Sequence, residues 1–142
     1  MPGAADRPRL APGHASLRDP VPAWDFDALA GAGALRSTAE DLLRFAEAHF
    51  GQAPGGLGAA IEESCRPRAP VGVGQGEVGL GWHRAPLPDR RVLLWHDGRT
   101  GGYASFLGVV REARAAVAAL SNVSTPVNDV ARRILDELLR PR

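Results

Sequence analysis

The residues best suited to chemistry lie in a glycine-rich segment from His96 to Gly102, with the letters His-Asp-Gly-Arg-Thr-Gly-Gly. The segment follows the apolar run 92–95, which is typical of a strand, so the His96 imidazole should project at that strand's end. Glycines beside it would let a ligand approach main-chain N–H groups closely. A polar strand end followed by a tight turn would give the same pattern. The residues alone leave both interpretations open.

Three other features could carry chemistry but lack the partners that it needs. No base lies near Cys65 in the sequence, so a packing role is favoured over a thiol hydrolase using His83 or His96. The four histidines lack the i, i+4 spacing of a helical metal pair, and no metal site is expected. The 74–79 segment has the letters G-x-G-x-x-G, but it follows a proline-rich loop and precedes a strand pattern. No nucleotide or other cofactor is therefore expected.

Composition excludes several classes of function. All 17 residues counted as Lys or Arg are arginine, so the chain has no lysine for a Schiff base, a Walker A site or a Ser-x-x-Lys nucleophile pair. A formal net charge of +1 argues against a nucleic-acid partner. The first 30 residues contain no long apolar run, so neither a signal peptide nor a membrane span is expected. A cytoplasmic location is the default expectation.

Hydrophobic spacing predicts two helices in the first half of the chain. Ser37 and Glu40 fit a capping box, and the apolar positions that follow predict an amphipathic helix over 38–50. His49 lies on the apolar stripe of this helix and is expected to be a partly buried packing residue. A shorter helix is expected over 57–64.

The hydrophobic period then changes to that of strands. The apolar runs 92–95, 103–110 and 115–120 are separated by turn signals at Asp97-Gly98, Gly101-Gly102 and Arg111-Glu112, which predicts an antiparallel meander. Pro126 suits the first residue of a last helix with an apolar stripe of Val127, Val130, Ala131, Ile134, Leu135, Leu138 and Leu139. The expected fold class is α+β, with an antiparallel sheet of three to four strands and the C-terminal helix packed on it.

The first 23 residues are expected to form an irregular segment, because prolines block both helix and central strand at Pro2, Pro8, Pro12, Pro20 and Pro22. Trp24 and Phe26 then anchor the coil on a packed body. Residues 24–142 form the expected domain.

The order of five short stretches carries a resemblance to a known family. They are residues 31–42, Gly79–Trp82, Trp95–Gly98, Tyr103–Phe106 and Leu120–Asn122, and their spacing holds from about Trp24 to Leu139. Together they resemble the C-terminal part of the penicillin-recognising serine hydrolases. This family includes class C β-lactamases, D-Ala-D-Ala carboxypeptidases, and related esterases and aminopeptidases.

The resemblance implies both a fold and a site. The fold would be the C-terminal half of a β-lactamase/transpeptidase-like domain. The family's third active-site motif, Lys-Thr-Gly or His-x-Gly, falls on His96-Asp97-Gly98. His96 would then hydrogen-bond or charge-pair with substrate, with Gly98 beside it, and the backbone N–H of Arg99 would be one of two oxyanion-hole donors.

The chain also departs from the family. Ser-x-x-Lys is absent because there is no lysine, and Tyr-x-Asn is absent because Tyr103, the one tyrosine, is followed by Ala104-Ser105. Residues 24–142 are therefore expected to be a partial domain without its nucleophile-bearing half, from a truncated gene, a misplaced start codon or a split protein.

Two functions follow from these expectations. The first is a C-terminal fragment of a serine hydrolase, inactive as given, whose parent cleaves a small-molecule amide or ester through an acyl-enzyme. The alternative is a non-catalytic binding or interaction module that retains the groove wall. Self-association through an exposed sheet edge is expected in either case. Members of this family are often exported, which qualifies the default location.

Overall fold

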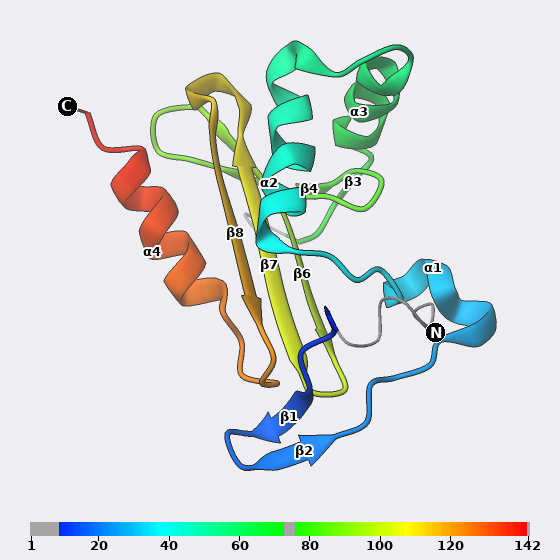
Figure 1. Ribbon diagram of the computed structural model, residues 1–142. Helices are drawn as coiled ribbons and strands as arrows, with labels where there is room; N and C mark the ends of the chain where they lie inside the picture. The colour runs from blue at the N-terminus through cyan, green and yellow to red at the C-terminus, as the bar shows by residue number, and fades with distance from the viewer. Residues whose placement is uncertain (1–8, 73–75, 142) are drawn as a thin grey trace.

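An antiparallel sheet forms the centre of the molecule (Figure 1). The computed structural model describes residues 9–72 and 76–141. In these ranges the sheet has six strands, which lie side by side in chain order: β3 (Ala69–Pro70), β4 (Glu77–Val78), β5 (His83–Pro86), β6 (Val92–Thr100), β7 (Tyr103–Val110) and β8 (Ala115–Ser121). The three long strands β6, β7 and β8 correspond to the three predicted apolar runs. The short strands β3, β4 and β5 bring the sheet to six strands instead of the predicted three to four.

Helices cover both faces of this sheet. One face carries α2 (Ala39–Glu47) and α3 (Leu57–Cys65), and the other carries α4 (Asn128–Leu138). The α+β class, the antiparallel sheet and the C-terminal helix packed on it are confirmed. The helix expected over 57–64 is confirmed as well.

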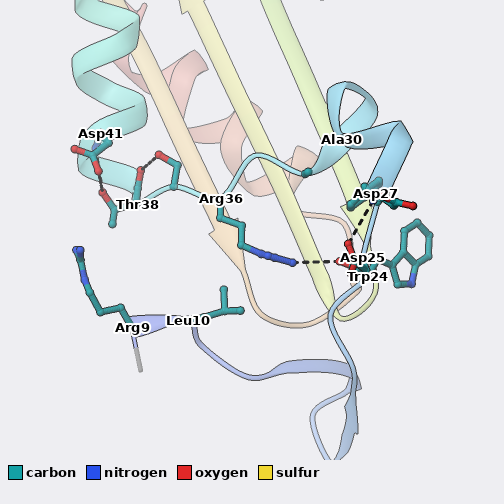
Figure 2. Close-up of a pocket in the computed structure, with 12 residues that line it drawn as sticks. Arg9, Leu10, Trp24, Asp25, Asp27, Ala30, Arg36, Thr38 and Asp41 are labelled. Carbon is teal, nitrogen blue, oxygen red and sulfur yellow. Dashed lines mark hydrogen bonds between the residues drawn. The ribbon is translucent and has the colours of Figure 1, made fainter. Parts of the chain in front are cut away.

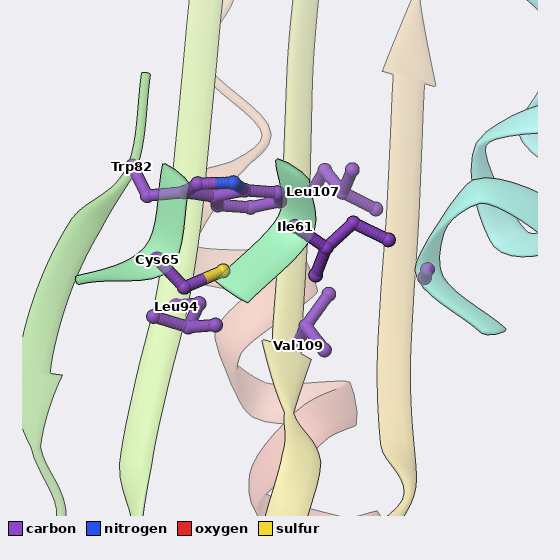
Figure 3. Packing of buried hydrophobic residues seen from close by; sticks show 7 residues of the cluster. Ile61, Cys65, Trp82, Leu94, Leu107 and Val109 are labelled. Carbon is purple, nitrogen blue, oxygen red and sulfur yellow. The ribbon is translucent and has the colours of Figure 1, made fainter. Parts of the chain in front are cut away.

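Alternation along the strands builds one core on each face, because successive side chains of a strand point to opposite sides. On β7, Phe106 and Val110 point toward α4, whereas Leu107 and Val109 point toward α2 and α3. The α4-side core contains Leu93, Phe106, Val110, Val117, Ala131 and Leu135. The opposite core, seen in Figure 3, contains Ala46, Ile61, Cys65, Trp82, Leu94, Leu107 and Val109.

The helix expected over 38–50 has a different start and a different end. Thr38, rather than Ser37, is the N-cap: its hydroxyl oxygen accepts from the Asp41 N–H at 3.1 Å and its O–H donates to the Asp41 carboxylate at 2.9 Å. The N-cap therefore lies one residue later than predicted, and the Asp41 carboxylate accepts from the Thr38 hydroxyl rather than from the N-cap backbone N–H as in a capping box. At its C-terminal end α2 continues into a wider π-helical turn, η3 (Ala48–Gln52), which closes with Gly51 at φ 84°.

The last helix also departs from its predicted stripe. It begins at Asn128 rather than at Pro126. Ala131 and Leu135 are buried against the sheet, but the exposed fractions of Val130, Ile134 and Leu138 are 61%, 47% and 58%. The predicted apolar stripe is therefore buried only in part, because α4 packs the side with Ala131 and Leu135 on the sheet and leaves these three side chains outside it. No helix in the described ranges is long and apolar enough to cross a membrane.

The proline-rich N-terminal segment is more ordered than expected. β1 (Gly13–Ser16) and β2 (Asp19–Val21) form a hairpin, so the irregular structure predicted for residues 1–23 is wrong over this stretch, while Pro2 and Pro8 lie outside the described residues. The hairpin docks on the β6–β7 turn, where Tyr103 donates its O–H to the Ala11 carbonyl at 2.7 Å. After it come η2 (Asp27–Leu29) and the short α1 (Ala30–Gly33). Long-range hydrogen bonds therefore fix a stretch that has no hydrophobic periodicity.

Candidate functional site

Strand β6, which carries the candidate site residues, has a partner strand on both sides in its first half but on one side only in its second half. Leu93–Trp95 pair with β5 on one side and β7 on the other, Val92 pairs with β5 alone, and His96–Thr100 pair with β7 alone. His96 therefore does not end the strand, and the predicted turn at Asp97-Gly98 is wrong. The turn is Gly101-Gly102, where Gly102 has a φ of 81° that glycine adopts without strain.

The second half of β6 presents a free edge. Thr100 and Tyr103 flank the two-residue turn and form its hydrogen-bonded closing pair, so the next pair, Arg99 with Ala104, is a non-hydrogen-bonded one. The N–H of Arg99 is therefore directed away from β7, toward the side where β5 has already ended. The side chain of His96 and the backbone of Gly98 are exposed along the same stretch. The sequence-predicted site residues thus share one open strand edge.

Aromatic rings gather at His83, the first residue of β5. His83 stacks on Trp95, with ring centroids 4.3 Å apart and planes inclined by 20°, and Trp95 in turn stacks on Phe106 at 5.9 Å. The His96 ring lies 6.3 Å from that of His83. Two imidazoles therefore border the free edge at its closed end. Within the part of the chain that the structure describes, no three His, Cys, Asp or Glu side chains gather as a metal site.

The first turns of α4 hold the strand from the same face of the sheet as Trp95 and Phe106. Asn128 donates its side-chain N–H to the Asp97 carboxylate at 2.6 Å, and the Arg132 guanidinium lies 4.9 Å from the centre of the Trp95 ring. Sequence reasoning did not single out Asn128 or Arg132. The sequence shows Asn128 as a polar residue shortly after Pro126, but this position does not reveal that its partner, Asp97, lies 31 residues away.

A cavity lies over the turn end of the sheet, against residues of β6, β7 and β8. It has a volume of about 160 Å³ and extends from Thr100 to Trp24, Phe26 and Arg36. A larger, more open groove of about 780 Å³ adjoins it between residues 24–27 and the start of α2, and Arg36 borders both (Figure 2). The Arg36 guanidinium donates to the Trp24 carbonyl at 3.2 Å, which ties the two walls together.

Comparison with known proteins identifies the family of this chain. The family model described as beta-lactamase matches residues 2–140. The chain belongs to the β-lactamase family.

Solved structures show the same fold. A class C beta-lactamase superposes with a TM-score of 0.84 at 19% identity, over 100% of this chain and 47% of its own. A beta-lactamase/D-alanine carboxypeptidase from Pseudomonas syringae gives 0.85 at 18%, over 99% and 48%. A class C beta lactamase from Rhodobacter sphaeroides gives 0.79 at 19%, over 96% and 47%. The chain thus spans about half the length of these structures, and no curated protein matches it.

Cys65 of this β-lactamase-family chain is a core residue and does not lie on the free edge of β6. Cys65 is 3% exposed and packs against Trp82 and Ile61 (Figure 3). Its Sγ lies 3.9 Å from the Ser64 hydroxyl, and burial raises the pKa of the thiol. A buried thiol with a raised pKa is a packing group rather than a nucleophile. Of the glycine pattern 74–79, residues 74 and 75 lie outside the described residues, and the remainder contains strand β4 rather than a helix start.

Proposed function

We propose that this chain supplies the substrate-binding wall of a serine hydrolase site that acts on small amides or esters. The observation that carries the proposal is the free edge of β6, with His96 exposed on it and the Arg99 N–H directed away from β7. Membership of the β-lactamase family supports it.

Each site residue has a defined part in the proposed chemistry. The N–H of Arg99 donates to the oxyanion that forms when a nucleophile attacks the acyl carbon, and Gly98 lets the ligand approach the strand closely. The His96 imidazole hydrogen-bonds or charge-pairs with the substrate. The nucleophile and its base come from outside these 142 residues, because the chain has no lysine and no Tyr-x-Asn.

The chain by itself should therefore bind but not turn over. Titration of ¹⁵N-labelled chain with N-acetyl-alanine methylamide, a small neutral amide, should shift the backbone resonances of residues 96–100. Incubation with a chromogenic β-lactam or a p-nitrophenyl ester should give no turnover above buffer. Turnover that a single Ser or Cys substitution abolishes would contradict the proposal, and so would shifts confined to another surface.

A non-catalytic interaction module is the second candidate, and two observations favour it. Strand β8 pairs with β7 on one side and has no strand partner on the other among the described residues. The exposed side chains Val130, Ile134 and Leu138 lie along α4, which packs on β8. An uncharged strand edge beside an apolar helix face favours pairing with another chain, so self-association forms part of this proposal.

A further inference from the structure

The most enclosed titratable side chain of the described residues lies far from the β6 edge. His49, in η3, is 1% exposed, and its ring stands nearly perpendicular to two parallel aromatic rings. Its centroid lies 4.9 Å from that of Phe45 and 5.1 Å from that of Trp82. The two flanking rings are 6.4 Å apart and inclined by 7°. His49 therefore joins α2 to the loop that leads into β5.

The hydrogen bonds of His49 define its protonation state. Nδ1 lies 3.0 Å from the Phe45 carbonyl oxygen, which can only accept, so Nδ1 carries the hydrogen. Nε2 is buried and has no hydrogen-bond partner in the described part of the chain. The neutral imidazole fits this site. A proton on Nε2 would place a charged donor where no acceptor faces it.

The charged groups around His49 do not offset such a proton. From η4 (Arg111–Ala113), Arg111 donates its Nε–H to the His49 carbonyl at 3.0 Å. From α3, Glu62 faces the same region, but both of its carboxylate oxygens already bind Arg111. Also on α3, Cys65 is buried and neutral, and Glu63 is paired with Arg66 and Arg68. Glu47 on α2 is exposed, and Arg114 donates to the Phe50 carbonyl of η3. Burial, and then the Arg111 charge, lower the pKa of His49 below 6.5, although the Phe45 and Glu62 contacts oppose them.

We propose that His49 is an acid-sensitive lock that holds α2 and η3 on α3 and Trp82 while its imidazole is neutral. Protonation places a charged donor without an acceptor on the buried Nε2 and adds a positive charge near that of Arg111. The segment 39–52 then detaches, because water can solvate the imidazolium only after it leaves the core. The proposal is independent of the β6 edge and of the proposed function.

The direction of the pH dependence follows from linkage. In the detached or unfolded state His49 takes up its proton near the ordinary value of 6.5, whereas in the native state it does so at a lower pH. The stabilisation by neutral His49 is thus complete above pH 6.5 and is lost as pH falls below it, until the native pKa is reached. Over that window the unfolding constant should rise about tenfold per pH unit through this one group.

The test compares urea unfolding from pH 5 to pH 8 in the unmodified chain, His49→Asn and His14→Asn. Asparagine at 49 keeps a donor for the Phe45 carbonyl but cannot titrate, so the extra tenfold change per pH unit should disappear whatever the absolute stability of the variant. His14 is only half-buried and docks the N-terminal hairpin, so its variant should retain that slope. Equal slopes for the chain and His49→Asn would overturn the proposal.

Two measurements on the unmodified chain keep the proposal testable if His49→Asn fails to fold. Ring-resonance titration should place protonation of native His49 below pH 6.5, and protonation at or above that value would refute the lock. Amide exchange at pH 5 should lose protection in α2 before α4. Equal loss in both helices would show global unfolding and would also refute it.

Discussion

His96 stands in the middle of a strand, so its substitution should leave the fold intact. In an enzyme reassembled from this chain and an N-terminal half carrying Ser-x-x-Lys and Tyr-x-Asn, His96→Ala should lower the acylation rate about 10- to 1000-fold, the scale of one lost charge-stabilising contact. Burst kinetics with an ester substrate would measure this change, with His14→Ala as the control. Unchanged kinetics would leave His96 as an exposed strand residue without a role in acylation.

Arg99 should act through its backbone rather than its side chain. Proline removes the N–H, and because that N–H faces away from β7, Arg99→Pro should preserve the β6–β7 ladder. In the reassembled enzyme, Arg99→Pro should lower kcat about 10²- to 10³-fold, as expected for one lost oxyanion donor.

The matched control is Arg99→Ala, which keeps the N–H and should stay near the parent rate. Equal losses in the proline and alanine variants would assign the effect to the guanidinium instead. Circular dichroism of both variants would establish that each is folded.

At the residue scale, sequence reasoning singled out His96, Gly98 and Arg99 but placed His96 at a strand end, whereas β6 continues to Thr100. His96, Gly98 and Arg99 share a short motif, and such a motif is visible in a single sequence. The contact between Asn128 and Asp97 joins positions 31 residues apart and depends on how α4 crosses the sheet. No local pattern encodes that crossing. The β1–β2 hairpin was missed for the same reason, since its docking partners lie near residues 102 and 122.

At the scale of elements, the start of α2 offers a sharp test. Thr38→Ala removes the side chain that accepts from the Asp41 N–H, and should lower the free energy of unfolding by about 1 kcal/mol. Ser37→Ala is the control, because the Ser37 hydroxyl only donates to the neighbouring Thr38 carbonyl. Chemical denaturation of the two variants would measure the difference. A larger effect at Ser37 would restore the capping box predicted from sequence.

Strand β6 shows why element boundaries are harder to predict than elements. Asp97-Gly98 has the composition of a hairpin turn, and so does Gly101-Gly102 four residues later. The choice between them depends on the partner strand: β7 offers eight residues in continuous register, and only the later turn lets all of them pair. Cross-strand pairing outweighed local turn preference.

At the scale of the whole molecule, the exposed surface is large for the mass. The accessible area is 9565 Å², about a third more than the roughly 7000 Å² expected for a folded monomer of 15.0 kDa. The free β8 edge and the apolar side of α4 contribute to this excess. Sequence predicted the sheet and the C-terminal helix packed on it, but not that α2 and α3 cover the opposite face or that part of the α4 stripe stays uncovered.

We expect the isolated chain to self-associate through the free β8 edge and the exposed apolar side of α4. Ile134→Glu places a charge in the middle of the exposed α4 side and should shift the chain toward monomer in sedimentation velocity. Leu80→Glu is the control, because Leu80 is exposed to 56% against 47% for Ile134 but lies in the loop before β5. A monodisperse parent chain would contradict the prediction, as would an equal effect of both substitutions.

The free edge of β6 has two fixed ends, so in the proposed function it limits the length of a ligand that lies along the strand. At one end β5 blocks it at the pair His83–Trp95, and at the other Gly101 lies against Trp24 so closely that a Cβ would overlap the indole. At about 3.3 Å per residue, the stretch between them is roughly 16 Å long. Short acyl groups fit within this span, whereas an extended polypeptide of more than about five residues must bend away from the strand. Changes in preferred substrate size should therefore arise at His83 or Trp24 rather than along the strand itself.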